Sequence, residues 1–169
     1  MRTHPVALFS DNDEDVAKVS MITHYDPRCI ESCIVAARLI RLLISGREKS
    51  IALLKAVVKG IKNHEVAEAT LSAPYAKEEE LETTGYVVHT LKIALWAFFT
   101  TKSFEEALIK AVNIGGDTDT YGSVCGAIAG AFYGESGIPD RWKRIHVFDM
   151  DYKDIANLGE EILKIKQRI

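Results

Sequence analysis

The sequence has no basic tract. Its 169 residues include 21 lysines and arginines against 24 acidic residues, giving a net charge of −3. Because nucleic-acid binding depends on clustered positive charge, this balance gives no support for a nucleic-acid partner. There is also no signal peptide pattern, and no apolar run long enough to cross a bilayer; the best candidate, 124–133, is short and rich in glycine and alanine. We therefore expect a globular cytoplasmic protein with no membrane partner.

Cysteine is scarce and odd in number, with Cys29, Cys33 and Cys125. Cys29 and Cys33 are four residues apart, which places them on one face of a helix and is typical of core packing. Neither has a histidine or a further cysteine at zinc-ligand spacing. This usage agrees with a reducing, cytoplasmic compartment.

Alternating strand patterns are also lacking, and apolar residues recur instead at helical spacing. Asp26 before Pro27 is a suitable start for one of the helices, since aspartate caps a helix and proline fits its first turn. The acidic segment 77–82 is expected to be an exposed loop. The sequence predicts one all-α domain spanning 1–169, with helices at about 13–22, 27–45, 48–61, 64–71, 84–100, 103–113, 119–134, 140–145 and 151–168.

Glycine recurs every four residues in the segment that follows Asp119, at Gly122, Gly126, Gly130 and Gly134. Each glycine in a helix interior costs about 1 kcal/mol relative to alanine. A stripe of glycines on one face therefore predicts that another helix, or a ligand, approaches that face closely.

The most informative segment is 115–120, Gly-Gly-Asp-Thr-Asp-Thr. Asp117, Asp119 and Thr120 can aim several oxygen atoms at one point from the first turn of a helix. Oxygen donors without nitrogen or sulfur favour a hard cation such as Mg²⁺ or Mn²⁺. Taken alone, however, the same residues suit an ordinary capped helix start equally well.

Together with 121–134, this segment resembles the C-terminal signature of the ADP-ribosylglycohydrolase family, which includes enzymes that remove ADP-ribose from arginine on dinitrogenase reductase. Three further segments resemble the same family in the same order. They are Met-Arg-Thr-His-Pro at 1–5, Thr-His-Tyr-Asp-Pro at 23–27 and Gly-Tyr-Val-Val-His-Thr-Leu at 85–91. The resemblance covers nearly all of the chain.

The resemblance implies the multi-helix, orthogonally packed fold of that family, which agrees with the helical pattern. It implies that Asp117, Asp119 and Thr120 ligate Mg²⁺, with Mn²⁺ as an alternative, in what is a binuclear centre in the family. It also implies that His24 and Tyr86 line an ADP-ribose site. On residue chemistry alone, His24 would be assigned to capping or the core, and Tyr86 to core packing.

The chain departs from the family in one respect. The family's Thr-Asp-Asp segment, which supplies further metal ligands, and its catalytic acid both lie upstream of the part that matches, and the chain contains no Thr-Asp-Asp. The catalytic residues are therefore expected outside this chain. We expect the chain to correspond to the C-terminal part of the family and to pair with the missing N-terminal part or with itself.

Two functional hypotheses follow. The first is a Mg²⁺-dependent hydrolase that removes ADP-ribose from protein side chains, with the arginine N-glycosidic bond as the expected linkage, or an inactive shortened form of it. The second is a non-catalytic module that keeps the fold and binds ADP-ribose or a protein partner. A generic helical interaction domain is a weaker third, because it explains segment 115–120 only as a cap.

Overall fold

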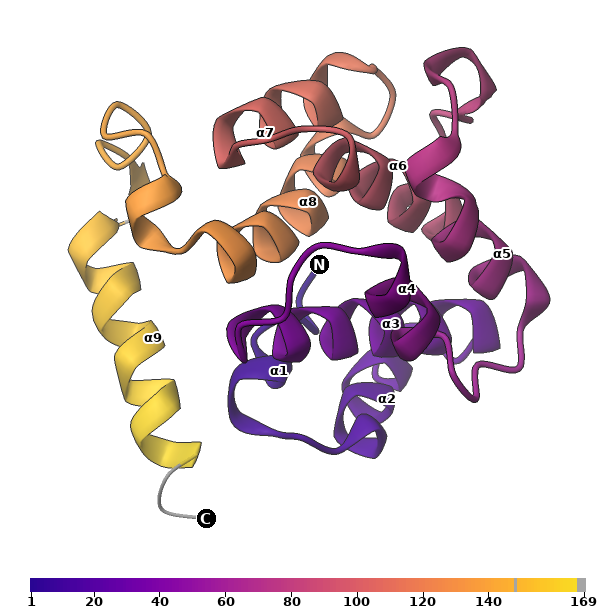
Figure 1. Cartoon of the computed structure of the whole chain (residues 1–169). Coiled ribbons are helices and arrows are strands. Elements are labelled where there is room, and N and C mark those ends of the chain that lie inside the picture. Colours follow the sequence, from indigo (N-terminus) through magenta and orange to yellow (C-terminus); the bar gives the residue numbers. More distant parts are fainter. Residues whose placement is uncertain (148, 167–169) are drawn as a thin grey trace.

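A computed structural model describes residues 1–147 and 149–166. Helices dominate these residues (Figure 1), which confirms the predicted all-α fold. The α-helices are α1 (Val6–Phe9), α2 (Asp13–Met21), α3 (Pro27–Ile44), α4 (Ile51–Val57), α5 (His64–Ser72), α6 (Val87–Phe99), α7 (Phe104–Asn113), α8 (Thr118–Tyr133) and α9 (Tyr152–Lys166). Three 3₁₀ turns, η1 (Ala73–Tyr75), η2 (Glu78–Glu80) and η3 (Glu135–Gly137), join them.

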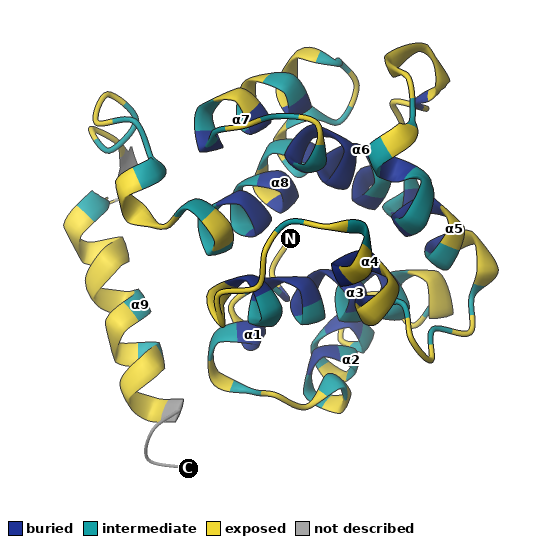
Figure 2. Cartoon of the chain, in the orientation of Figure 1, coloured by how far each residue is buried: buried dark blue, intermediate teal, exposed yellow. Residues whose placement is uncertain are grey.

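Helix α6 forms the centre of the core. It is apolar on nearly every side, which is the pattern of a helix enclosed by other helices. It packs against α3, α5, α7 and α8, and Figure 2 shows it almost entirely buried. Its side chains Ile93, Leu95 and Phe98 have no exposed surface. The start of α6 is consequently held in a fixed position relative to α3 and α8.

Side-chain caps begin several helices where the sequence predicts them. Asp26 accepts the backbone N–H of Arg28, with Pro27 in the first turn of α3 as expected. Ser103 caps α7 by accepting the N–H of Glu106. The spacing of Ser103 and Glu106 is that of a capping box, in which Glu106 would accept the N–H of Ser103; the Glu106 carboxylate accepts the N–H of Lys102 instead.

The glycine stripe lies on the face of α8 that packs against α7. A Cβ atom at Gly122 would lie 3.0 Å from Val112 Cγ1, and one at Gly126 would lie 3.6 Å from Leu108 Cδ1. The predicted close approach is therefore found, with α7 as the approaching helix. Gly134 differs from the others: it ends α8 with a φ of +67°, which favours glycine.

Several segments differ from the sequence-based expectation. Helix α1 was not predicted, and α4 is shorter than the predicted helix 48–61. Residues 140–145 form turns rather than the predicted helix, stabilised by the Trp142 N–H donating to the Pro139 carbonyl. A short antiparallel hairpin, β1 (His146–Val147) with β2 (Met150–Asp151), was not predicted, because two-residue strands leave no readable alternation. The predicted loop 77–82 contains η2 and buries Leu81.

Helix α9 packs against α1 and β2 and exposes most of its surface (Figure 2). The predicted final helix extended to 168, of which 167 and 168 lie outside the described residues. Within residues 1–147 and 149–166, none of the helices combines the length and apolarity needed to cross a membrane.

The stripe generates a matched pair of stability predictions. Gly126→Ala gains helix propensity and meets only an ordinary contact, so it should leave the free energy of unfolding unchanged or raise it by up to about 1 kcal/mol. Gly122→Ala must displace the stiff side chain of Val112, so it should be about 1 kcal/mol less stable than Gly126→Ala. Urea unfolding of both variants would measure this. Equal gains in both variants would contradict the close approach of α7 at Gly122.

Candidate functional site

Two turns that are distant in the sequence touch at the site. Gly116 has a φ of +75°, and a Cβ atom there would lie 2.5 Å from the carbonyl oxygen of Thr83. The hydroxyl of Tyr121, on α8, donates to the carbonyl of Thr84 at 2.8 Å. Only glycine at 116 allows this approach of backbone to backbone. The contact places the start of α8 beside the start of α6.

Asp117, at the N-terminus of α8, does not act as a side-chain cap. Its Oδ1 accepts a hydrogen bond from Thr120 Oγ1 at 2.9 Å. A Cβ atom at Gly85 would lie 3.5 Å from its Oδ2. Asp119 is exposed in the first turn of the same helix. The capping interpretation therefore does not account for Asp117, whose carboxylate is directed to Thr120 and the 83–86 turn.

These three side chains are candidate cation ligands, but by themselves they cannot complete a coordination sphere. They offer carboxylate and hydroxyl oxygens, the donors that Mg²⁺ prefers, but Mg²⁺ takes six oxygen ligands and uses water for several of them. Among residues 1–147 and 149–166, no three histidines, cysteines or acidic residues are grouped closely enough to hold a metal ion. The set fits one side of a hard-cation site and leaves the opposite side to water or to another polypeptide segment.

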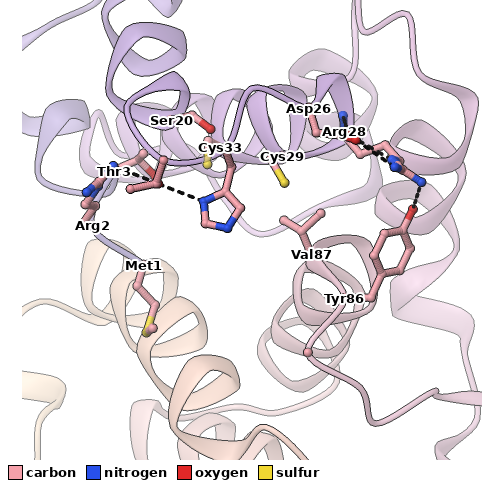
Figure 3. A pocket seen from close by; sticks show the side chains of 13 residues that line it. Met1, Arg2, Thr3, Ser20, Asp26, Arg28, Cys29, Cys33, Tyr86 and Val87 are labelled. Atoms are coloured by element: carbon pink, nitrogen blue, oxygen red, sulfur yellow. Dashed lines mark hydrogen bonds and ion pairs between the residues drawn. The ribbon is translucent and has the colours of Figure 1, made fainter.

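A cavity of about 600 Å³ lies next to this turn, between the N-terminal residues, the start of α3 and the start of α6. It is lined by both residues that the resemblance assigned to ADP-ribose, His24 and Tyr86. Figure 3 shows Tyr86 on one side of it, beside Arg28. The structure therefore brings His24 and Tyr86 together, although they are distant in the sequence. Asp117 and Asp119 are not among the lining residues of this cavity.

The Tyr86 side chain is fixed by two other elements. Its hydroxyl donates to Glu65 Oε2 at 2.8 Å and accepts from Arg28 Nη1 at 3.3 Å. The Arg28 guanidinium lies 5.5 Å from the centre of the Tyr86 ring, within cation–π range. Partial burial, followed by the Glu65 carboxylate, raises the pKa of Tyr86. The phenol is thus a neutral group with a defined orientation.

Arg28 is in turn held by Asp26. The guanidinium donates from Nε to Oδ1 at 2.9 Å and from Nη2 to Oδ2 at 2.8 Å, a bidentate pair drawn in Figure 3. These bonds, with the Arg28 backbone N–H, lower the pKa of Asp26 to about 2. Sequence reasoning assigned Asp26 only to capping and gave Arg28 no role. Asp26 lies within the Thr-His-Tyr-Asp-Pro segment and Arg28 follows it directly, and this closeness to His24 is the signal that could have identified them.

His24 is held by its neighbour in the chain. Its Nδ1 lies 2.8 Å from Thr23 Oγ1, which accepts a hydrogen bond from Arg2 Nη2 at 3.0 Å. Arg2 also donates to the carbonyl of Val19 at 3.1 Å. The N-terminal residues are thereby tied to the turn between α2 and α3. Sequence reasoning did not detect this tie, because it joins positions 21 residues apart.

A smaller chamber of about 130 Å³ adjoins the cavity and is lined by Thr120. The buried hydroxyls of Thr3 and Ser32, which also line it, have no hydrogen-bond partner among the described residues. Buried hydroxyls normally find a partner, so a polar ligand group or water is expected to meet them. The chamber and the cavity are neighbours, since Met1, Thr3, Cys33, Gly85 and Val87 line both of them.

This arrangement can be compared with known proteins. The family model described as ADP-ribosylglycohydrolase matches residues 1–168. The chain belongs to the ADP-ribosylglycohydrolase family. Among solved structures of this family, an ADP-ribosylglycohydrolase-related protein complex superposes with a TM-score of 0.84 at 31% identity, over 96% of this chain. The agreement shows that the helices of this chain adopt the family's fold.

Curated members of the ADP-ribosylglycohydrolase family are similar over most of the chain. ADP-ribosylarginine hydrolase Tri1 of Serratia proteamaculans is 33% identical over 91% of this chain, and ADP-ribosyl-[dinitrogen reductase] glycohydrolase of Rhodospirillum rubrum is 32% identical over 84%. The matched regions cover 40% and 47% of those two proteins and 57% of the solved structure. The chain thus spans about half the length of its relatives.

His4, in the smaller chamber, generates a pH prediction. Burial, followed by the nearby N-terminal ammonium, lowers its pKa from 6.5 to about 4. As the pH falls below about 6.5 the unfolded chain takes up a proton on His4, and the folded chain does so only near pH 4. The contribution of His4 to stability is therefore complete above pH 6.5 and is lost as the pH falls toward 4.

Replacing His4 should remove this acid-side loss. We expect His4→Asn to reduce the fall in unfolding free energy between pH 6.5 and pH 4 by about 2 kcal/mol. His64→Asn, at an exposed position, is the matched control and should leave the pH profile unchanged. Urea denaturation at several pH values would measure both. A His4→Asn profile parallel to that of the unmodified chain would contradict the burial of a neutral imidazole.

Proposed function

We propose that this chain forms part of an enzyme that removes ADP-ribose from ADP-ribosylated proteins, with the N-glycosidic bond to arginine as the linkage. The observation that carries the proposal is that two neighbouring cavities bring the candidate residues together. The larger is lined by His24 and Tyr86, and the smaller is lined by Thr120, whose hydroxyl donates a hydrogen bond to Asp117. Both curated relatives are, by name, hydrolases of ADP-ribosyl bonds.

The charges around the cavity suit a diphosphate. Arg2, Arg28 and the N-terminal residue Met1 line it together with one carboxylate, that of Asp26. The positive side chains therefore outnumber the negative one, and guanidinium groups match phosphate oxygens in geometry. Tyr86 adds a fixed aromatic face and a hydroxyl, which suits a nucleoside. These features support ADP-ribose as the ligand over an apolar or cationic one.

We further propose that Asp117, Asp119 and Thr120 hold Mg²⁺, or Mn²⁺ in its place, as ligands on one side of a binuclear centre. A bound ion of this kind would polarise ribose oxygens and a water molecule during hydrolysis. The residues of this chain contribute orientation: the Thr120 hydroxyl fixes the Asp117 carboxylate, and the 83–86 turn fixes both against the cavity. His24 and Tyr86 would bind the part of ADP-ribose that lies in the larger cavity, at a distance from the cation ligands.

The proposed hydrolysis needs a general acid or base, and the titratable groups described around the cavity do not supply one. A general acid or base works best with a pKa near the operating pH. Asp26 is committed to Arg28 with a pKa of about 2, and His4 is neutral above about pH 4. Neither is suited to deliver a proton at neutral pH. We therefore propose that the catalytic acid comes either from the polypeptide segment that the family carries upstream, supplied by a partner chain, or from a residue of a second copy of this chain.

An alternative is favoured by the incomplete ligand set. If the chain works alone, it is an ADP-ribose-binding module without hydrolytic activity, or a structural module that keeps the fold. The hydrolase and the binding module both require ADP-ribose to bind in the cavity, but only the hydrolase cleaves the bond. Binding and release must therefore be measured separately.

Binding is tested by titrating ADP-ribose into the purified chain with and without Mg²⁺ in a calorimeter. Asp117→Asn and Asp119→Asn should each weaken the Mg²⁺-dependent binding about tenfold, since each removes a charged oxygen donor. Asp140→Asn, with a side chain 91% exposed, is the control and should bind like the unmodified chain. Absence of ADP-ribose binding under both conditions would contradict both the enzyme and the binding module.

Release of ADP-ribose from an arginine-modified protein is then measured for the same variants. Mg²⁺-dependent release that is lost in Asp117→Asn would support a site completed by self-association. Release that requires an added N-terminal part from a family member would support completion by a partner. Binding without release in either arrangement would reject the hydrolase and support the binding module.

A further inference from the structure

The hydrogen bonds around Thr23 bear on which nitrogen of His24 carries its proton. Thr23 Oγ1 lies 3.0 Å from Arg2 Nη2 and 2.8 Å from His24 Nδ1. Among the described residues these are its only side-chain partners. A hydroxyl has one proton to donate, and it accepts through its lone pairs. Accepting at one contact uses one lone pair and leaves the proton available for the other contact.

The contact with Arg2 has a fixed direction. A guanidinium group carries only donors and stays protonated at any ordinary pH. Thr23 Oγ1 must therefore accept from Arg2. The Thr23 proton is then free to be donated, and within the described residues the acceptor in reach is His24 Nδ1. Donation by a positive group also polarises the hydroxyl and strengthens it as a donor.

We propose that Arg2 and Thr23 act as positioning residues that hold His24 in the tautomer with its proton on Nε2. Nδ1 accepts from the Thr23 hydroxyl, which fixes both the ring orientation and the tautomer. Nε2 has no partner among the described residues, and His24 lines the cavity. His24 therefore presents an N–H donor to the ligand, which selects for an acceptor oxygen such as that of a phosphate or a hydroxyl.

This assignment explains why the N-terminal segment matters to the site. Arg2 is anchored a second time on the Val19 carbonyl at the end of α2, at 3.1 Å, so its guanidinium cannot turn away freely. The backbone N–H groups of Thr23 and His24 both donate to the Ser20 carbonyl, at 3.2 and 2.9 Å, which fixes the turn itself. The Thr23 hydroxyl is held between two anchored partners.

The tautomer can be read directly by long-range ¹H–¹⁵N correlation spectra of the histidine-labelled full chain at about pH 8.5, where an unperturbed imidazole is neutral. The signals of His24 are assigned by their loss in His24→Gln. We expect a single Nε2–H tautomer in the unmodified chain. Thr23→Val, which keeps the shape and removes the hydroxyl, should show both tautomers. Thr23→Ser should restore the single one.

Two results would overturn the assignment. One is a substantial Nδ1–H population in the unmodified chain, which would mean that Thr23 accepts from both neighbours. The other is a Thr23→Val spectrum with the same single tautomer, which would mean that the hydroxyl does not set it. Unchanged thermal unfolding of Thr23→Val would show that neither result comes from a loss of fold.

A second readout rests on the proposed function. If ADP-ribose is the ligand, Thr23→Val should bind it about three- to tenfold more weakly than the unmodified chain. This is the effect expected from weakening one hydrogen bond, that from His24 Nε2–H to the ligand. Thr23→Ser should bind like the unmodified chain. The two failures are distinguishable: lack of ADP-ribose binding by the unmodified chain rejects the ligand and leaves the tautomer result intact. Equal affinity of Thr23→Val and the unmodified chain would reject the role of the tautomer in binding.

Discussion

The site depends on the contact between the turn at 83–86 and the turn at Gly115–Asp117. The backbone atoms approach so closely that a side chain at Gly116 would overlap the Thr83 carbonyl. Because the buried helix α6 starts directly after one turn and α8 after the other, this contact fixes their N-termini side by side. Tyr86, on the first turn, and the Asp117–Thr120 pair, on the second, owe their proximity to it. A site assembled from helix starts in this way depends on helices that are held rigidly in the core. Most residues of α6 are buried, which holds its N-terminus in place.

The groups around the cavity are better suited to holding a ligand than to transferring protons. The groups that line the cavity and the smaller chamber are held in fixed charge states: Arg28 by Asp26 and Tyr86 by Glu65 and Arg28 in the cavity, and His4 by burial in the chamber. Groups of this kind orient a ligand well, because they cost little reorganisation on binding. They are unsuited to exchanging protons at neutral pH. The physical character of the described residues thus agrees with a chain that holds the ligand and one side of a cation site, while the acid chemistry belongs to another segment.

Local signals in the sequence were sufficient for much of the fold. The starts of α3 and α7 follow from Asp26 and Ser103, since a cap acts within three residues. The glycine stripe likewise predicted that another helix would pack closely against α8. It could not predict that this helix is α7. By contrast, the turns at 140–145 have helical composition, and only the tertiary context decides against a helix. The motif segments identified His24, Tyr86 and the 115–120 loop, but from a family pattern rather than from residue chemistry.

What the sequence could not show is how the site residues are held. Arg2 meets Thr23, and Glu65 meets Tyr86, each across 21 residues, and neither pair has a spacing that any periodic rule would detect. These contacts decide what the site residues can do. A histidine in the Thr-His-x-x-Pro segment could be a donor, an acceptor or a cap. In the proposed arrangement, the Arg2 guanidinium can only donate, so the Thr23 hydroxyl keeps its proton for His24 Nδ1, and His24 presents Nε2–H to the cavity. The chemistry of a site residue is thus set by partners outside its motif, which is why a motif alone identifies a position more securely than a function.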